Sequence, residues 1–93
     1  MANVSKAEMV NRVAKEVGIP KRQANEALDS VMNHVKKALK RGDRVTFVGF
    51  GSFMVRKRKA RTARNPRTGG TIHVPARRVP VFKPGADLKD SVR

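Results

Sequence analysis

Hydrophobic positions in the first 42 residues recur with the 3.6-residue period of an α-helix. Ser5 and Glu8 have the spacing of a capping box, in which the serine accepts a backbone N–H and the glutamate reaches back. Gly18 suits the end of this helix, and Pro20 suits the opening of a second one. The two predicted apolar stripes comprise Met9, Val10, Val13 and Val17, and then Ala24, Ala27, Leu28, Val31, Val35, Ala38 and Leu39.

The helical period stops at Gly42, which follows a cluster of cations suited to the C-terminus of a helix. Gly49 and Gly51 flank Phe50 and indicate a tight connection or a bulge. The segment 65–70, Asn-Pro-Arg-Thr-Gly-Gly, is a dense turn signal. Runs rich in valine, isoleucine and phenylalanine predict strands at 45–47, 53–55, 71–74 and 79–82, and a short helix follows Pro84-Gly85.

Charge is concentrated in the second half of the chain. Lysine and arginine number 22 against 7 aspartate and glutamate residues, a formal net charge of +15. Residues 1–40 carry eight basic and four acidic side chains, whereas residues 41–93 carry fourteen and three. Between Arg44 and Ala86 there is no acidic residue, and seven of the twelve residues from Arg56 to Arg67 are cations. A hairpin with this charge repels itself unless it meets a polyanion.

Composition excludes several classes of protein. Hydrophobic residues make up 39% of the chain, too many for a disordered basic tail. No run approaches the roughly 18 apolar residues of a membrane span, and the N-terminus lacks the apolar stretch of a secretory signal. Without cysteine, neither a disulfide nor a thiolate metal site can form. These features indicate a soluble, intracellular nucleic-acid-binding protein with no membrane partner.

No group of residues indicates catalysis. His34 and His73 lie far apart in the sequence, and the seven acidic residues show no metal-ligand spacing. The Gly49–Gly51 segment is not followed by the Gly-Lys-Ser/Thr of a phosphate-binding loop. We therefore expect no enzyme activity, no small-molecule substrate, no metal and no cofactor.

The hydrophobic inventory favours a homodimer. The basic segment from Arg56 to Pro75 is typical of a projecting hairpin that buries little, which leaves a body of about 70 residues. A single core of that size supplies only about 3–5 kcal/mol, and a second copy of the chain is a common way to bury more surface. The residues expected in the dimer core are Phe47, Phe50, Phe53, Phe82, Leu28, Val31 and Val35.

Three ordered motifs resemble those of the bacterial HU and integration host factor family. They are Gly49-Phe50-Gly51-Ser52-Phe53, Arg64-Asn65-Pro66-Arg67-Thr68-Gly69 and Val79-Pro80-Val81-Phe82-Lys83-Pro84-Gly85, within a resemblance that runs from about Ser5 to Val92. The resemblance implies an α+β fold, in which two N-terminal helices form an intertwined dimer base. A three-stranded antiparallel sheet then carries a long protruding β-hairpin arm, and a short C-terminal helix follows.

The same resemblance implies one domain over residues 1–93. Its helical dimerisation part covers about 5–42, the sheet and arm about 44–83, and the C-terminal helix about 86–92. We call residues 56–77 the arm. The chain departs from many relatives at Pro20, where they place a serine or threonine cap, and at Ala86, where many HU proteins have a lysine.

The implied function is architectural binding of double-stranded DNA, largely without sequence specificity. The arms would enter the minor groove and bend DNA or stabilise bent DNA, with a preference for bent, nicked or gapped duplexes. Pro66 matches the arm-tip proline that wedges between base pairs and kinks the duplex. Such a protein would compact and protect the chromosome in the cytoplasm, at the nucleoid.

Individual DNA contacts are carried over on the arm and the body. Arginines along the arm match positions on the groove and phosphates, Asn65 and Arg67 flank the wedge, and three lysines match positions on the body. The full set of expected DNA-binding residues is Arg56, Arg58, Arg61, Arg64, Asn65, Pro66, Arg67, Arg77, Arg78, Lys83, Lys6 and Lys89.

Two other classes of function remain open from the sequence. One is a site-specific architectural factor of the integration host factor kind, often a heterodimer, which reads DNA deformability at preferred sites. The other is a basic protein that binds RNA or the ribosome, or a membrane-active cationic protein. The stretch from Met54 to Val81 contains no Phe, Tyr or Trp, which argues against stacking on unpaired bases.

Overall fold

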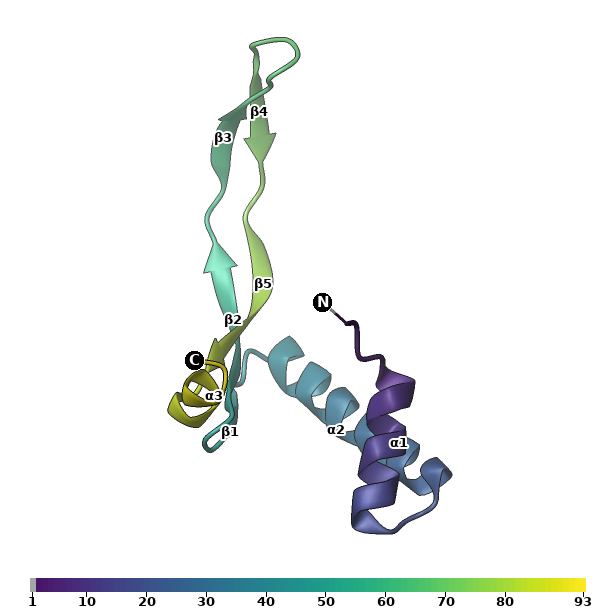
Figure 1. Ribbon diagram of the computed structural model, residues 1–93. Helices are drawn as coiled ribbons and strands as arrows, with labels where there is room; N and C mark the ends of the chain where they lie inside the picture. Colours follow the sequence, from purple (N-terminus) through teal and green to yellow (C-terminus); the bar gives the residue numbers. More distant parts are fainter. Residues whose placement is uncertain (1) are drawn as a thin grey trace. The chain divides into compact units, whose positions relative to one another are not determined.

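The computed structural model describes residues 2–93 (Figure 1). Its elements form two compact units, one ending at Lys37 and the other covering Ala38–Arg93. The predicted order of two helices, strands with a hairpin and a last short helix is confirmed. The elements are α1 (Lys6–Val17), α2 (Lys21–Lys40), β1 (Val45–Phe47), β2 (Gly51–Arg58), β3 (Arg61–Arg64), β4 (Thr71–Val74), β5 (Arg77–Pro84) and α3 (Ala86–Ser91).

Helix α1 begins and ends where its sequence signals place it. The Ser5 side chain accepts the backbone N–H of Glu8 at 3.3 Å, and Gly18 adopts the left-handed conformation with φ 80°. The Glu8 carboxylate pairs with Arg12 at 3.2 Å, so only the serine half of the expected capping box is formed. Glu8 forms an i,i+4 ion pair in place of its expected return contact to Ser5. On an exposed helix such a pair contributes only a few tenths of a kcal/mol to helix stability.

Helix α2 starts directly after Pro20, whose carbonyl accepts the N–H of Ala24 at 3.1 Å. The proline therefore occupies the N-cap position, where it supplies a carbonyl but no side-chain acceptor for the free N–H groups. In the first unit, the buried core consists of Val10, Ala14 and Ala24. Beside it lies an apolar groove of about 200 Å³, lined by Val10, Val13, Ala24, Ala27, Leu28 and Val31.

The second unit contains a three-stranded antiparallel sheet with the strand order β1-β2-β5. Its register places Val45 opposite Phe53 and Phe53 opposite Phe82, so these residues share one face of the sheet. The Phe53 and Phe82 ring centroids are 4.8 Å apart, and Phe47 meets Phe53 edge-on at 6.2 Å. The aromatic cluster is only partly buried, since Phe47 and Phe82 each keep 38% of their surface exposed.

Tight turn geometry connects β1, β2 and the start of α3. Phe50 donates to the carbonyl of Phe47 at 2.9 Å, which closes the expected turn around Gly49. Gly85 donates to the carbonyl of Phe50 at 2.8 Å. At Gly51, φ is 158°, and a Cβ atom there would lie 2.6 Å from Cζ of Phe82 and 2.7 Å from the backbone oxygen of Lys83. Only glycine fits this position without displacing the backbone of β5.

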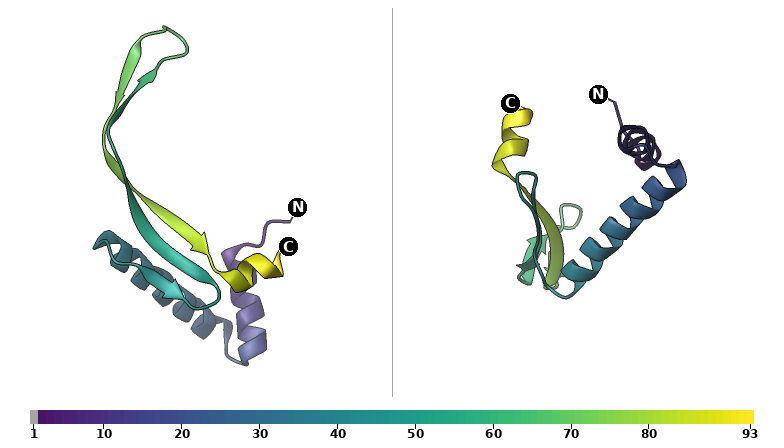
Figure 2. Two further views of the ribbon diagram at one scale, coloured as in Figure 1. Left: turned by 90° about the vertical axis from the view of Figure 1, so that its left-hand side faces the viewer. Right: turned by 90° about the horizontal axis from the view of Figure 1, so that it is seen from below.

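The arm consists of two ladders in a single register. Strands β2 and β5 pair as far as Arg58 and Arg77, and β3 and β4 resume with Arg61 opposite Val74. Continuing either ladder across the gap places Ala60 opposite Pro75, so no residue is inserted or skipped. Figure 1 shows β3 and β4 extending the hairpin beyond the three-stranded sheet, and Figure 2 shows that the hairpin curves along its length. The interruption at 59–60 and 75–76 was not predicted.

Replacing Gly51 with alanine is expected to lower the free energy of unfolding by roughly 2–3 kcal/mol, because the methyl group overlaps the Phe82 ring and the backbone of β5. Denaturant unfolding followed by circular dichroism, at one protein concentration, measures the change. Gly70→Ala is the matched control, since a Cβ there meets only the Thr68 hydroxyl, at 3.4 Å. Equal stability of the two variants would contradict the close packing at Gly51.

Candidate nucleic-acid interface

The cations of the arm lie on two opposite faces. Alternate residues of a strand point to opposite sides, so Arg56 and Arg58 share one face of β2 while Lys57 lies on the other. Directly paired residues share a face, which adds Arg77 to the side of Arg58 and Arg78 to the side of Lys57. We call the side with Arg56, Arg58 and Arg77 the outer face, and the side with Phe53, Phe82, Lys57 and Arg78 the inner face.

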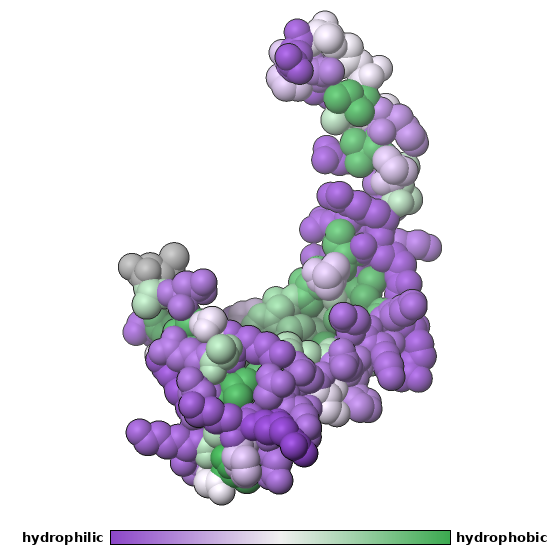
Figure 3. Space-filling view, turned by 90° about the vertical axis from the view of Figure 1, so that its right-hand side faces the viewer, coloured by the Kyte–Doolittle hydropathy of each residue, from purple (hydrophilic) through white to green (hydrophobic). Residues whose placement is uncertain are grey.

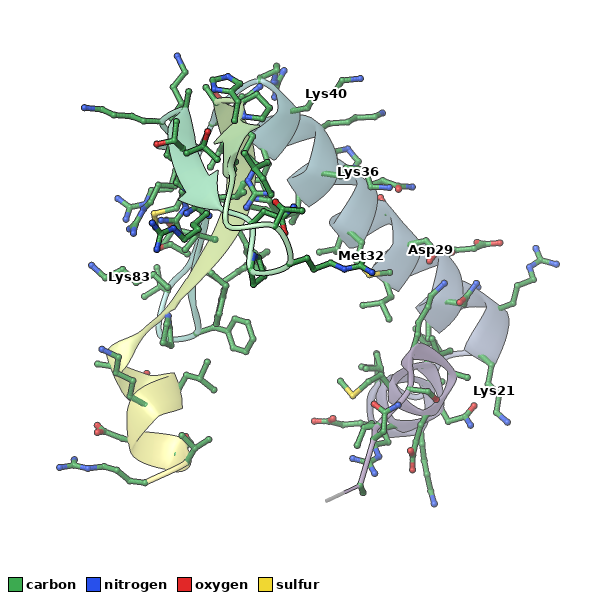
Figure 4. The ribbon with its side chains drawn as sticks, turned by 90° about the horizontal axis from the view of Figure 1, so that it is seen from above. Lys21, Asp29, Met32, Lys36, Lys40 and Lys83 are labelled. Carbon is green, nitrogen blue, oxygen red and sulfur yellow. The ribbon has the colours of Figure 1, made fainter. Side chains whose placement is uncertain are left out.

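Polar side chains extend the outer face down to the base of the sheet. Thr46, Ser52 and Lys83 form one row across β1, β2 and β5, and the two hydroxyl oxygens are 3.0 Å apart. In the next row, a guanidinium nitrogen of Arg44 lies 4.0 Å from the sulfur of Met54. A groove of about 350 Å³ runs past Arg44, Thr46, Ser52 and Lys83. Figure 4 shows the Lys83 side chain pointing outward from β5.

Arg44, Thr46 and Ser52 are candidate binding residues that the sequence analysis did not single out. Hydroxyl and guanidinium groups beside an exposed lysine are typical donors to DNA phosphates. Alternation within each strand does not identify them, because the register of β1, β2 and β5 is what places Thr46 and Ser52 on the face that also carries Lys83.

A basic cleft of about 470 Å³ occupies the interruption between the two ladders. It is lined by four cations, together with Ala60, Val74 and Pro75. Pro75 has no N–H to donate across the hairpin, and a short alanine stands opposite, which leaves the cleft open. The cations are Arg58, Lys59, Arg61 and Arg77.

Beyond the interruption, the arm has a polar and an apolar face. Arg64 lies with Thr62, Thr71 and His73, whereas Arg61 lies on the opposite face with Ala63, Ile72 and Val74. The expected arginine set is therefore divided between the two sides of the arm. In Figure 3 the arm is mostly hydrophilic, with isolated hydrophobic residues near its far end.

The arm tip presents an exposed proline on a tightly bonded loop. Asn65 closes the loop by donating its N–H to the carbonyl of Gly70 at 2.7 Å, and its side-chain oxygen accepts the N–H of Arg67 at 2.9 Å. The Thr68 hydroxyl accepts the N–H of Gly70 at 3.3 Å. Pro66 lies between Asn65 and Arg67 with its ring exposed. The side chain of Asn65 is thus used within the loop, where it holds Pro66 at the tip.

Three other expected DNA-binding residues are not among the residues that form the outer face. Arg78 donates to the carbonyls of Leu39 and Lys40 at 3.1 and 3.3 Å, so it caps the end of α2. Lys6 forms an ion pair with Asp29 in the first unit. Lys89 is an exposed residue of α3.

The part of the chain that the structure describes contains neither a cluster of metal-ligating side chains nor a membrane-spanning helix. Within residues 2–93, no three His, Asp or Glu side chains lie close enough to hold a metal ion. None of the helices in these residues has the length and apolar character needed to cross a membrane.

A helical pair joined to a sheet with a long basic hairpin is the architecture of a bacterial DNA-binding protein, and the family model of that description matches residues 4–93. The chain therefore belongs to the HU family of bacterial DNA-binding proteins. It is 47% identical to DNA-binding protein HU of Geobacillus stearothermophilus over 90 residues, which cover 97% of this chain and 100% of that protein. It is 48% identical to DNA-binding protein HU 1 of Bacillus subtilis over 89 residues, 96% of this chain and 97% of the other.

Solved structures agree with this assignment. The Anabaena HU–DNA cocrystal structure matches with a TM-score of 0.88 and 42% identity, covering 95% of this chain and 96% of that one. HU from Thermotoga maritima matches with a TM-score of 0.70 and 34% identity, covering 96% and 98%. Family membership also agrees with the expectation that the protein is not an enzyme.

Replacing Arg78 with alanine is expected to lower the free energy of unfolding by about 1–2 kcal/mol, since two carbonyls at the end of α2 would then lack a charged donor. Arg77→Ala is the control, because Arg77 is the adjacent exposed arginine and points to the outer face. It should change stability by less than about 0.5 kcal/mol. Thermal unfolding of both variants tests this; equal losses of stability would show that Arg78 does not stabilise the end of α2.

Proposed function

We propose that this protein is an architectural binder of double-stranded DNA, which bends duplexes or stabilises bent ones, largely without sequence preference. The observation that carries the proposal is the arm itself, a two-ladder hairpin lined with cations and tipped by the exposed Pro66. Its site of action would be the chromosome, at the nucleoid. There, compaction and protection of DNA follow from bending many sites that share only their phosphate backbone.

The dimensions of the arm favour bending. The minor groove of straight B-DNA is about 6 Å wide, whereas the two backbones of a β-ribbon are already about 4.8 Å apart before side chains are added. The groove must widen to admit the arm, and widening it bends the duplex toward the major groove. Pro66 would complete this distortion, since its rigid apolar ring can enter between base pairs without bringing an N–H that needs a partner.

The energy for the distortion comes from the charges and from apolar contact. Each phosphate neutralised by an arm cation releases condensed counterions, which favours binding whatever the sequence. Ala63, Ile72 and Val74 offer an apolar face suited to the sugars that wall the minor groove. Together these terms offset an unstacking cost of a few kcal/mol per kinked step.

We also propose that the binding form is a homodimer and that residues 1–93 of each chain act as a single DNA-binding domain. A single chain leaves large apolar side chains exposed on α2 and in the turn before β2, including Val31 at 49% and Phe50 at 50%. The groove beside Val10 and Leu28 is a further apolar surface that a second copy would cover. Two arms from such a dimer would embrace one duplex.

RNA is the weaker partner on this geometry. Double-stranded RNA has a wide, shallow minor groove that a two-stranded arm would not fill. Single strands are bound by stacking on aromatic rings, and the arm has none between Met54 and Val81. Competition of duplex DNA against double-stranded RNA and against a selected DNA sequence separates architectural binding from the RNA-binding and site-specific alternatives.

The wild-type protein should prefer a nicked or gapped duplex over the intact one by about tenfold or more, because a pre-softened duplex removes part of the kinking cost. Pro66→Ala should reduce this preference severalfold while affecting intact duplex much less. Pro80→Ala is the matched control, since Pro80 is exposed on β5 opposite Val55, away from the tip. Fluorescence anisotropy with the three DNAs gives the ratios. Equal weakening on nicked and intact DNA would reject the wedge.

Ile72→Ser should weaken DNA binding without changing its salt dependence, because it removes apolar surface and no charge. Arg58→Gln, by contrast, should lower the slope of log affinity against log salt by about one for each phosphate that the variant no longer neutralises. Titrations at several salt concentrations separate the two effects. A lower slope for Ile72→Ser, or unchanged affinity, would show that the apolar face of the arm does not touch DNA.

A further inference from the structure

A second concentration of positive charge lies on α2 and the residue that follows it. Lys36 and Lys40 are one turn apart, as are Lys37 and Arg41, so the four cations form two adjacent rows. All four are exposed, and Figure 4 shows Lys36 and Lys40 on α2. We call Lys36, Lys37, Lys40 and Arg41 the helix patch.

The helix patch faces away from the apolar side of α2. The apolar stripe follows Ala24, Leu28, Val31 and Val35, whereas the four cations occupy the opposite part of the helical wheel. No acidic residue lies between Asp29 and Asp43. Among the ion pairs of residues 2–93, only Arg41 in the patch has a carboxylate partner, Asp43 at 3.3 Å.

Stability of the helix does not account for the patch. Cations suit the C-terminus of a helix, but Arg78 already donates to the carbonyls of Leu39 and Lys40 there. Like charges at i,i+4 destabilise an exposed helix by a few tenths of a kcal/mol per pair, and the patch holds two such pairs. The favourable interaction with the helix dipole and the repulsion between like charges thus act against each other, so helix stability gives little reason for four cations here, and their concentration favours contact with a polyanion.

Within the second unit, the C-terminal part of the patch and the outer face lie on opposite sides of the β2–β5 ladder. Arg78 reaches the end of α2 from the inner face of the β2–β5 ladder. Arg56, Arg58 and Arg77 leave the opposite side of that ladder. A duplex held against the outer face thus leaves Lys40 and Arg41 exposed to solvent.

We infer that the helix patch binds the phosphates of a second DNA duplex, so that one protein bound through its arms can bridge two duplexes. This inference rests on the proposed function for the first duplex only. Charge complementarity identifies the phosphate backbone as the partner, because the patch consists of cations alone and cations on the surface of a helix can contact phosphates on a duplex of any sequence.

The test uses a duplex immobilised on beads, saturated with the full-length protein, washed, and then offered a fluorescent second duplex. The test variant is Lys36→Gln, Lys37→Gln and Lys40→Gln, which keeps good helix formers in α2. The charge-matched control is Lys15→Gln, Lys21→Gln and Arg93→Gln, whose side chains are exposed and lie outside the patch. Circular dichroism verifies that both variants fold, and anisotropy with a single duplex measures binding through the arms.

Wild type and control should capture the second duplex, and the test variant should retain at least about fivefold less of it, while both variants bind a single duplex equally. Equal capture by the two variants overturns the inference, because net charge or the arms would then suffice. A selective loss of single-duplex binding in the test variant also overturns it, since the patch would belong to the first site. If the wild-type protein binds the immobilised duplex but captures no second duplex, bridging is refuted and the proposed function stands. If it does not bind the immobilised duplex at all, the proposed function is refuted. Stronger capture of double-stranded RNA than of DNA assigns the patch to another partner.

Discussion

The register of one antiparallel ladder determines where the chain can meet DNA. At its base, Gly51 passes close to the Phe82 ring and the backbone of Lys83, a fit that favours the observed alignment of β2 with β5. A slip by one residue would turn one strand over relative to the other. It would bring outer-face residues of β5, such as Arg77 and Lys83, onto the side of β2 that carries Phe53. Because the same register continues into β3 and β4, this alignment also decides which residues share a face farther along the arm.

The two halves of the chain differ in the interaction that dominates them: apolar surface in the first and positive charge in the second. Among residues 2–37, the first unit buries only Val10, Ala14 and Ala24, and its longest apolar stripe remains largely at the surface. The second unit carries most of the net charge on a hairpin with little interior. Each half is therefore incomplete by itself. The apolar surfaces favour a second copy of the chain and the cations favour a polyanion, so association stabilises what a single chain cannot.

Local signals explain how much of the fold was predictable. Ser5, Gly18 and Gly42 mark helix ends through short-range chemistry, and the turn at 65–70 follows from its residue types. The arm and its tip were predicted from the motifs that resemble those of the HU and integration host factor family. The division of the arm arginines, the capping role of Arg78 and the Thr46–Ser52 row depend on strand register and on a contact 38 or 39 residues apart. Such long-range geometry leaves no mark on composition or periodicity.

The interruption at Ala60 and Pro75 divides the arm into two hydrogen-bonded ladders joined by an unpaired segment. Strand pairing stops there without a change in register, so fewer backbone hydrogen bonds hold the hairpin at this point than within either ladder. A protein whose arms surround a duplex, as proposed here, has to admit the DNA from the side wherever no free end is in reach. A hairpin that bends most easily at mid-arm would let its tip move aside for the duplex while the base of the arm stays anchored to the sheet.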